Sequence, residues 1–102
     1  MISLIEEKRK MLEELCRTYH VERLDIFGSA ATGKFRPDAS DIDFIVSFNR
    51  SSDMNLADQY FGLWEDLRDM FGRDVDLVIE RAMKNPYFIK AVNDTRRIVY
   101  AA

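Results

Sequence analysis

Two aspartates separated by one residue, Asp41 and Asp43, have a spacing that could support chemistry. Side chains two positions apart in a β-strand point to the same face, so a strand here would present both carboxylates together. Mg²⁺ prefers oxygen ligands and keeps positions open for water and substrate phosphates. The Asp41-x-Asp43 pair is therefore a candidate metal site, although such a pair by itself is also typical of a solvated strand end.

Further acidic residues strengthen the candidate. Asp43 is followed directly by the apolar run 44–46, where an unpaired charge is costly without a partner or a cation. Asp76 lies in a second apolar segment and could supply a third carboxylate, and Asp74 is the alternative on the same side of that segment. We favour Asp76 because it has apolar residues on both sides. Two metal ions about 3.5–4 Å apart, bridged by such carboxylates, can orient an attacking oxygen and stabilise a leaving phosphate.

A candidate phosphate site precedes the acids. The stretch GSAATGKF, residues 28–35, nearly matches the phosphate-binding P-loop, but Phe35 replaces the Mg²⁺-binding Ser or Thr. The chain is also too short for the repeated βαβ units of a P-loop enzyme. We interpret Gly28 and Ser29 as the phosphate contact instead, because a glycine lets phosphate oxygens approach backbone N–H groups and the serine hydroxyl adds a donor. Lys34 is then an incidental neighbour.

Apolar periodicity and turn residues predict the elements that must position these side chains. Helices are expected over residues 3–19 and 56–71 and in a short stretch beginning near Pro86. Strands are expected at Val21–Phe27, Asp41–Phe48, Asp74–Glu80 and 96–101, and one helical turn could begin at Ser29 in the loop before Asp41. This order of helices and strands predicts a mixed α/β chain.

Composition limits the classes of protein that fit. The 102 residues, 47% of them hydrophobic, are enough for one domain, which we place at residues 1–102. A net charge of −3 argues against strong nucleic-acid binding. Cys16 is the only cysteine, so an internal disulfide is impossible and a cytoplasmic location is expected. The sequence shows neither a signal peptide nor a segment of membrane-spanning length, so no membrane association is expected.

The stretch FGSAATGKFRPDASDIDFIV, followed by VDLVI, resembles the G-S…D-x-D…D signature of the DNA polymerase β-type nucleotidyltransferase superfamily. Within it, the chain is similar to the minimal nucleotidyltransferases, small proteins often paired with HEPN-domain toxins. The resemblance implies an α/β (α+β) fold with a small mixed β-sheet flanked by helices. It also implies that Gly28 and Ser29 hold the nucleotide, that Asp41, Asp43 and Asp76 bind two Mg²⁺ ions, and that Asp76 helps to activate the nucleophile.

The sequence departs from the family pattern in two places. The usual continuation after Gly-Ser is x-A-R-G, whereas Thr32 stands here in place of the arginine, so Lys34 or Arg36 would have to neutralise phosphate charge. The loop of eleven residues between Ser29 and Asp41 is one residue longer than the commonest spacing. Weaker activity is expected from the first departure and little effect from the second.

The resemblance implies transfer of AMP from ATP, with release of pyrophosphate, to an acceptor hydroxyl. The expected acceptor is a tyrosine of a HEPN-type toxin, which would make this chain an antitoxin in a hetero-oligomer. One alternative is an antitoxin or subunit that acts by contact alone. Another is transfer to a small molecule or an RNA end with a separate substrate-binding subunit. Tyr87, Phe88 and Tyr100 are either core residues or a surface for a partner.

Overall fold

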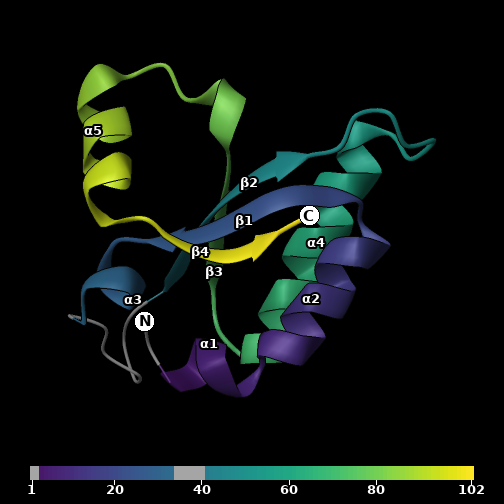
Figure 1. Cartoon of the computed structure of the whole chain (residues 1–102), viewed down its shortest axis with the longest axis horizontal. Helices are drawn as coiled ribbons and strands as arrows, with labels where there is room; N and C mark the ends of the chain where they lie inside the picture. Colours follow the sequence, from purple (N-terminus) through teal and green to yellow (C-terminus); the bar gives the residue numbers. More distant parts are fainter. Residues whose placement is uncertain (1–2, 34–40) are drawn as a thin grey trace.

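Four β-strands form one mixed sheet, in the order β3, β2, β1, β4 (Figure 1). The strands are β1 (Val21–Phe27), β2 (Ile42–Phe48), β3 (Val75–Ile79) and β4 (Arg97–Ala101). β1 runs antiparallel to both β2 and β4, whereas β3 runs parallel to β2. This computed structural model describes residues 3–33 and 41–102. Its mixed sheet, flanked by helices, confirms the fold class expected from the sequence.

Three helices cover one face of the sheet: α1 (Ser3–Glu7), α2 (Arg9–Thr18) and α4 (Leu56–Phe71). Alternating residues of the central strands point to this side, as the pleat requires. The main core contains the fully buried side chains Ile5, Leu12, Leu24, Ile26, Phe44, Leu63 and Leu67. Strand alternation therefore leaves the intervening residues of β1 and β2 for the opposite face.

The single helix predicted over residues 3–19 is wrong, because the chain bends at Lys8. Lys8 has φ −106° and ψ 12°, and its N–H donates to the Ile5 carbonyl only three residues earlier, at 3.2 Å. The bend separates α1 from α2 and leaves both Ile5 and Leu12 with no exposed surface. The apolar spacing predicted the buried face but did not predict the break.

Helix α4 has the bounds expected from its apolar stripe. The Asn55 side chain caps its start by accepting from the Asp58 N–H at 2.8 Å. Gly72 ends the helix in a left-handed conformation, with φ 62°, and its N–H donates to the Arg68 carbonyl. The helix forms the connection that parallel strands β2 and β3 require.

Two side chains of α4 close the outer edge of β3, the strand at one end of the sheet. The Tyr60 hydroxyl donates to the Leu77 carbonyl at 2.6 Å, and Trp64 Nε1 donates to the Val75 carbonyl at 2.9 Å. The Asp74 carbonyl points the other way and accepts from the Ile42 N–H of β2, because successive carbonyls of a strand point to opposite sides. Both aromatic side chains are partly buried and also pack against the main core.

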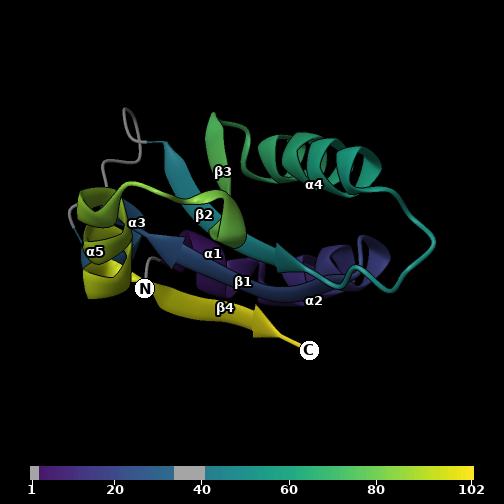
Figure 2. The ribbon, with the colours of Figure 1, turned by 90° about the horizontal axis from the view of Figure 1, so that it is seen from above.

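The opposite face of the sheet is covered at one end by α5 (Pro86–Thr95). Figure 2 shows this helix at the end of the sheet away from α2 and α4. Val92 packs with Phe27 and Ile45 in a second, smaller apolar cluster, and the Phe88 ring lies edge-on to Phe27 at 6.0 Å. Tyr87 is 85% exposed, so it is not a core residue. Tyr100, by contrast, packs against the main core.

Two short helical segments complete the described parts of the chain. Helix α3 (Ser29–Thr32) begins directly after β1, as the sequence predicted, and a 3₁₀ turn, η1 (Glu80–Ala82), follows β3. No helix within residues 3–33 and 41–102 is long and apolar enough to cross a membrane. The predicted phosphate-binding stretch therefore lies at a strand end, with a helical turn directly after it.

Candidate active site

The parallel pairing of β2 with β3 brings two of the predicted acids together. Asp43 and Asp76 are direct register partners on these neighbouring strands, so their side chains project from the same face. Asp41 is exposed and lies immediately before β2, which begins at Ile42. The strand pairing thus positions Asp43 and Asp76, while Asp41 approaches from the segment that leads into β2.

The charges of these three carboxylates act on one another. The pKa of Asp43 is raised from its ordinary value of 3.8 to about 6, chiefly by burial, and further by the negative charges of Asp76 and Asp41. Burial, and then the charge of Asp76, also raises the pKa of the Tyr60 hydroxyl. Neighbouring carboxylates that repel one another favour the binding of a cation.

The donor set fits a hard divalent cation, because it consists of carboxylate oxygens. Within the described residues, however, no group of three His, Cys, Asp or Glu side chains lies close enough together to hold a metal ion as positioned. The structure therefore provides the adjacent pair Asp43 and Asp76, and a cation would have to draw Asp41 toward that pair.

Gly28 lies directly beside Asp43. It adopts φ 69° and ψ −143°, a conformation that side chains rarely permit, and it begins helix α3. A Cβ atom at this position would lie 2.8 Å from Asp43 Oδ2. The absence of a side chain at residue 28 therefore allows the backbone turn to approach the acidic pair.

The backbone N–H of Gly28 donates to the Thr95 hydroxyl at 3.1 Å, so it already has a partner within the protein. The N–H groups of Ala31 and Thr32 turn back to the Gly28 carbonyl. Because the first N–H groups of a helix have no partner inside it, those of Ser29 and Ala30 are the backbone donors available to a phosphate. The sequence located the turn, but it did not reveal that the Gly28 donor is occupied.

The two candidates for the third carboxylate differ in their positions. Asp74 precedes β3, and its side chain lies 4.0 Å from Arg68 at the C-terminal end of α4. Asp76 lies inside β3 and beside Asp43. The geometry favours Asp76. Lys34 and Arg36, the expected substitutes for the missing arginine, lie outside the described residues.

The chain matches the model of the nucleotidyltransferase domain family over residues 8–99. It belongs to this family. A Methanocaldococcus jannaschii protein named "Putative protein adenylyltransferase" is 36% identical over 91 residues, which cover 89% of this chain and 86% of that relative. A second protein of that name from the same organism is 30% identical over the same shares of both chains. The predicted membership of a nucleotidyltransferase superfamily is confirmed, and the chain is a nucleotidyltransferase.

Solved structures agree with the nucleotidyltransferase fold. A structure described as a "putative minimal nucleotidyltransferase" has a TM-score of 0.73 and 28% identity, and covers 90% of this chain and 89% of its own. A chain from the complex of a tri-AMPylated Shewanella oneidensis HEPN toxin with an MNT antitoxin has a TM-score of 0.65 at 18% identity, and covers 96% and 73%. The second likeness shows a shared fold.

A charged cluster that sequence reasoning missed lies beside the acidic site of the nucleotidyltransferase. Asp25, in β1, has no exposed surface and accepts from the Arg96 guanidinium at 2.6 Å and from Arg23 at 2.9 Å. Arg96 also donates to Glu80 at 2.9 Å, so it connects β1 with η1. The available signal was an aspartate flanked by Leu24 and Ile26 in the inner half of the strand, where a buried carboxylate requires a positive partner.

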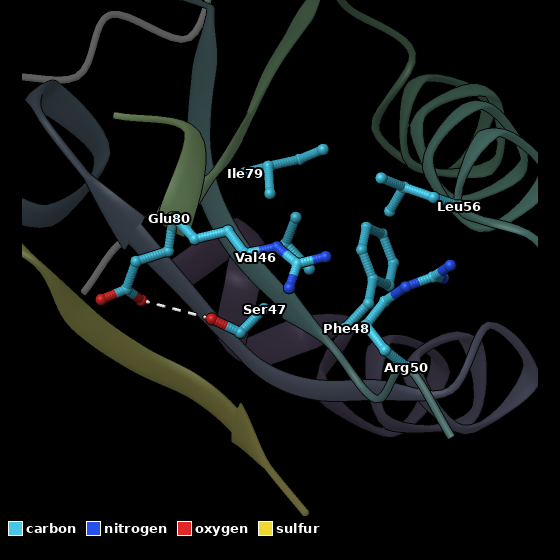
Figure 3. Close-up of a pocket in the computed structure, with 8 residues that line it drawn as sticks. Val46, Ser47, Phe48, Arg50, Leu56, Ile79 and Glu80 are labelled. Atoms are coloured by element: carbon cyan, nitrogen blue, oxygen red, sulfur yellow. Dashed lines mark hydrogen bonds between the residues drawn. The ribbon is translucent and has the colours of Figure 1, made fainter. Parts of the chain in front are cut away.

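A hollow of about 290 Å³ lies at the opposite end of β2 from the acids (Figure 3). It is lined by apolar side chains of β2, β3 and α4, with Arg50, Glu80 and Arg81 at its rim. Glu80 is engaged by Arg96, and Arg50 donates to the buried amide of Gln59. The hollow contains none of the predicted site residues of the nucleotidyltransferase, so we do not assign the reaction to it.

Proposed function

We propose that this nucleotidyltransferase transfers AMP from ATP to an acceptor hydroxyl, with Asp41, Asp43 and Asp76 holding Mg²⁺ and with Gly28 and Ser29 at the nucleotide phosphates. The observation that carries this proposal is the placement of Asp43 beside Asp76 in register, with the Gly28 turn packed against Asp43. The raised pKa of Asp43 supports it, because a cation would relieve the repulsion that burial and two neighbouring acids create.

The site residues would have different roles in the transfer. When bound, two divalent cations would supply charge stabilisation to the attacking and leaving oxygens. The N–H groups of Ser29 and Ala30 and the Ser29 hydroxyl would orient the triphosphate. Asp76, which is exposed, would accept the proton of the acceptor hydroxyl. The oxygen of that hydroxyl would then bond to the α-phosphorus of ATP while pyrophosphate leaves.

The acceptor that we propose is a tyrosine of a HEPN-type toxin, with this chain as its antitoxin in a hetero-oligomer. Support comes from the relatives named as protein adenylyltransferases and from the fold shared with a chain of a toxin and antitoxin complex. We place the reaction in the cytoplasm and assign it to residues 1–102 as one minimal domain.

A contact-only antitoxin is the second candidate. Thr32, exposed at the end of α3, occupies the place of the family's arginine. In addition, the three acids, all among the described residues, do not lie close enough together to hold a metal ion jointly. Both features are expected of a site with reduced activity. A contact-only protein would still bind and neutralise its partner after the acids are removed.

The deciding experiment uses the purified protein, Mg²⁺, ATP and the product of the adjacent gene. Intact-mass spectrometry should show the partner gaining one or more AMP units with the wild type and none with the Asp41→Asn, Asp43→Asn double variant. Asp76→Asn should also abolish the gain, whereas Asp74→Asn, the matched loss of one charge outside the site, should retain it. A stable complex without any AMP gain would favour the contact-only antitoxin.

If neither AMP transfer nor a complex were found, the proposal would fail for a protein acceptor. The same assay with small-molecule hydroxyl compounds or RNA in place of the partner would then test the remaining acceptor classes. The net charge of −3 makes RNA the weaker of these two expectations.

A further inference from the structure

Helix α5 is connected to the nucleotide turn through its last residue. The Thr95 hydroxyl accepts from the Gly28 N–H at 3.1 Å and donates to the Ala91 carbonyl of its own helix at 3.1 Å. Because its single proton points into the helix, the oxygen lone pairs face Gly28. Residues 67 positions apart in the chain are thereby joined at the turn.

The residue after Thr95 fixes this connection in place. Arg96 directly follows α5, and its guanidinium bonds to the buried carboxylate of Asp25 at 2.6 Å and to Glu80 at 2.9 Å. A planar guanidinium that contacts two carboxylates has little freedom to move, and a lysine could not reproduce both contacts. The C-terminal end of α5 is therefore held against β1 and η1 at the level of the Gly28 turn.

The position of Gly28 determines the space above Asp43. The site where a Cβ would stand is only 2.8 Å from Asp43 Oδ2, so a small rotation of this backbone unit would alter the approach to the acidic pair. Gly28 is also the residue directly before α3, whose first N–H groups we assign to the nucleotide phosphates. Any residue that fixes Gly28 thus also aligns the phosphate donors with the acids.

We propose that Thr95, held by the Arg96 ion pairs, is a positioning residue that fixes the Gly28 turn for nucleotide binding. This inference rests on the proposed function, because it concerns the same nucleotide site. The hydrogen bonds of the Thr95 hydroxyl are to Gly28 and to its own helix, so its effect on the site acts through Gly28. Helix α5 accordingly contributes to the site, although it carries none of the G-S…D-x-D…D residues.

The test compares Thr95→Val, which removes the acceptor at nearly constant shape, with Thr95→Ser, which keeps the hydroxyl. Thr18→Val is a matched control: Thr18 also ends a ten-residue helix and donates to the carbonyl four residues earlier, at 3.0 Å. Two quantities are measured for each protein. They are the hydrogen-exchange rate of the Gly28 amide by NMR, with the Ile45 amide as internal reference, and the affinity for a non-hydrolysable ATP analogue with Mg²⁺ by calorimetry.

Thr95→Val should accelerate Gly28 exchange about fivefold or more relative to Ile45, as expected for loss of one hydrogen bond. It should also weaken the affinity for the ATP analogue by about five- to tenfold. Thr95→Ser and Thr18→Val should match the wild type in both measurements. A purely structural role would instead affect the exchange of Gly28 and Ile45 alike and would leave the affinity unchanged.

The outcomes separate this inference from the proposed function. If the wild type binds the analogue and Thr95→Val binds it equally well, the positioning role is overturned and the proposed function stands. If the wild type binds no analogue, the proposed function fails and the positioning role fails with it. Arg96→Lys provides a second variant, and it should change Gly28 exchange in the same direction as Thr95→Val.

Discussion

Asp43 has an environment that is unfavourable for its negative charge, because it is partly buried, adjacent to Asp76 and close to the Gly28 turn. A carboxylate in this position is poorly solvated and repelled by its neighbours, which raises its pKa. The arrangement costs stability in the metal-free protein and creates the negative potential that attracts a cation. Function and stability therefore oppose each other at this residue.

The raised pKa of Asp43 predicts how stability depends on pH in protein freed of metal by EDTA. An acid whose folded pKa is about 6, against an ordinary value of 3.8, keeps its proton longer when folded. Its stabilising effect is complete below about pH 4 and is lost as pH rises through about 6. Asp43→Asn should remove this loss and gain about 1 kcal/mol at pH 7, a figure reduced for the partial exposure of the group.

Denaturant unfolding at pH 4.5 and pH 7.5 checks this prediction, with Asp58→Asn on the exposed start of α4 as the control. The wild type should lose more stability between the two pH values than Asp43→Asn does. Equal pH dependence in the two proteins would contradict the assignment of the raised pKa to Asp43.

Gly28→Ala tests the close approach of the turn to the acids. The new methyl group would meet Asp43 Oδ2 at 2.8 Å on a backbone with φ 69°, so we expect a loss of about 2–3 kcal/mol and of nucleotide transfer. Gly72→Ala is the control, because its φ of 62° is similar and open space surrounds it. It should cost only about 1 kcal/mol of strain, by thermal unfolding, and should retain transfer.

At the scale of the elements, α2 and α4 are joined where Tyr19 lies against Gly62. A Cβ on Gly62 would lie 2.3 Å from Tyr19 Cε1, and the Tyr19 hydroxyl is fixed by Asp66 at 2.6 Å. A glycine in the middle of a helix costs about 1 kcal/mol relative to alanine. Here that cost permits close packing of an aromatic ring.

This contact predicts that the effect of Gly62→Ala on stability changes sign when Tyr19 is removed. Gly62→Ala should destabilise the wild type by about 2 kcal/mol, because the ring must move and its bond to Asp66 weakens. In a Tyr19→Ala background, the same substitution should stabilise the protein by up to about 1 kcal/mol through helix propensity alone. Urea unfolding of the four proteins measures both effects, and an equal effect in the two backgrounds would exclude the proposed steric cause.

The elements were largely predictable where local signals agree. Helix α4 has an Asn cap, an apolar stripe and a terminal glycine, and strand β1 has its predicted bounds. The break at Lys8 was not predictable, because it follows from burying Ile5 and Leu12 against a sheet formed later in the chain. For the site, the spacing identified the turn and the acids. It could not identify Thr95 as the partner of Gly28 or Arg96 as a partner of Asp25, because both lie about 70 residues away in the chain.

For the whole molecule, the ion pairs of Arg96 with Asp25 and Glu80 join β1, η1 and the end of α5, which are far apart in the sequence. Asp25, with no exposed surface, has two arginine partners whose side chains differ in exposure, 14% for Arg96 and 43% for Arg23. Removing the better buried partner would leave a buried charge less compensated. The two arginines therefore should not contribute equally.

Arg96→Met should lower the free energy of unfolding by about 3 kcal/mol, and Arg23→Met by about 1 kcal/mol or less. Chemical denaturation measures both values. Their order matters more than their size, and a larger loss for Arg23→Met would show that Arg96 is not the main partner of Asp25.

The sheet edges have a consequence for how the molecule can associate. At one edge, Tyr60 and Trp64 donate hydrogen bonds to carbonyls of β3. At the other edge, the pairing of β4 is irregular near Val99, whose carbonyl accepts from Arg9 at 3.0 Å. Interrupted edges resist pairing with strands of other chains. Crowded copies of this protein should therefore be poor templates for fibril growth, and any partner must recognise side chains rather than extend the sheet.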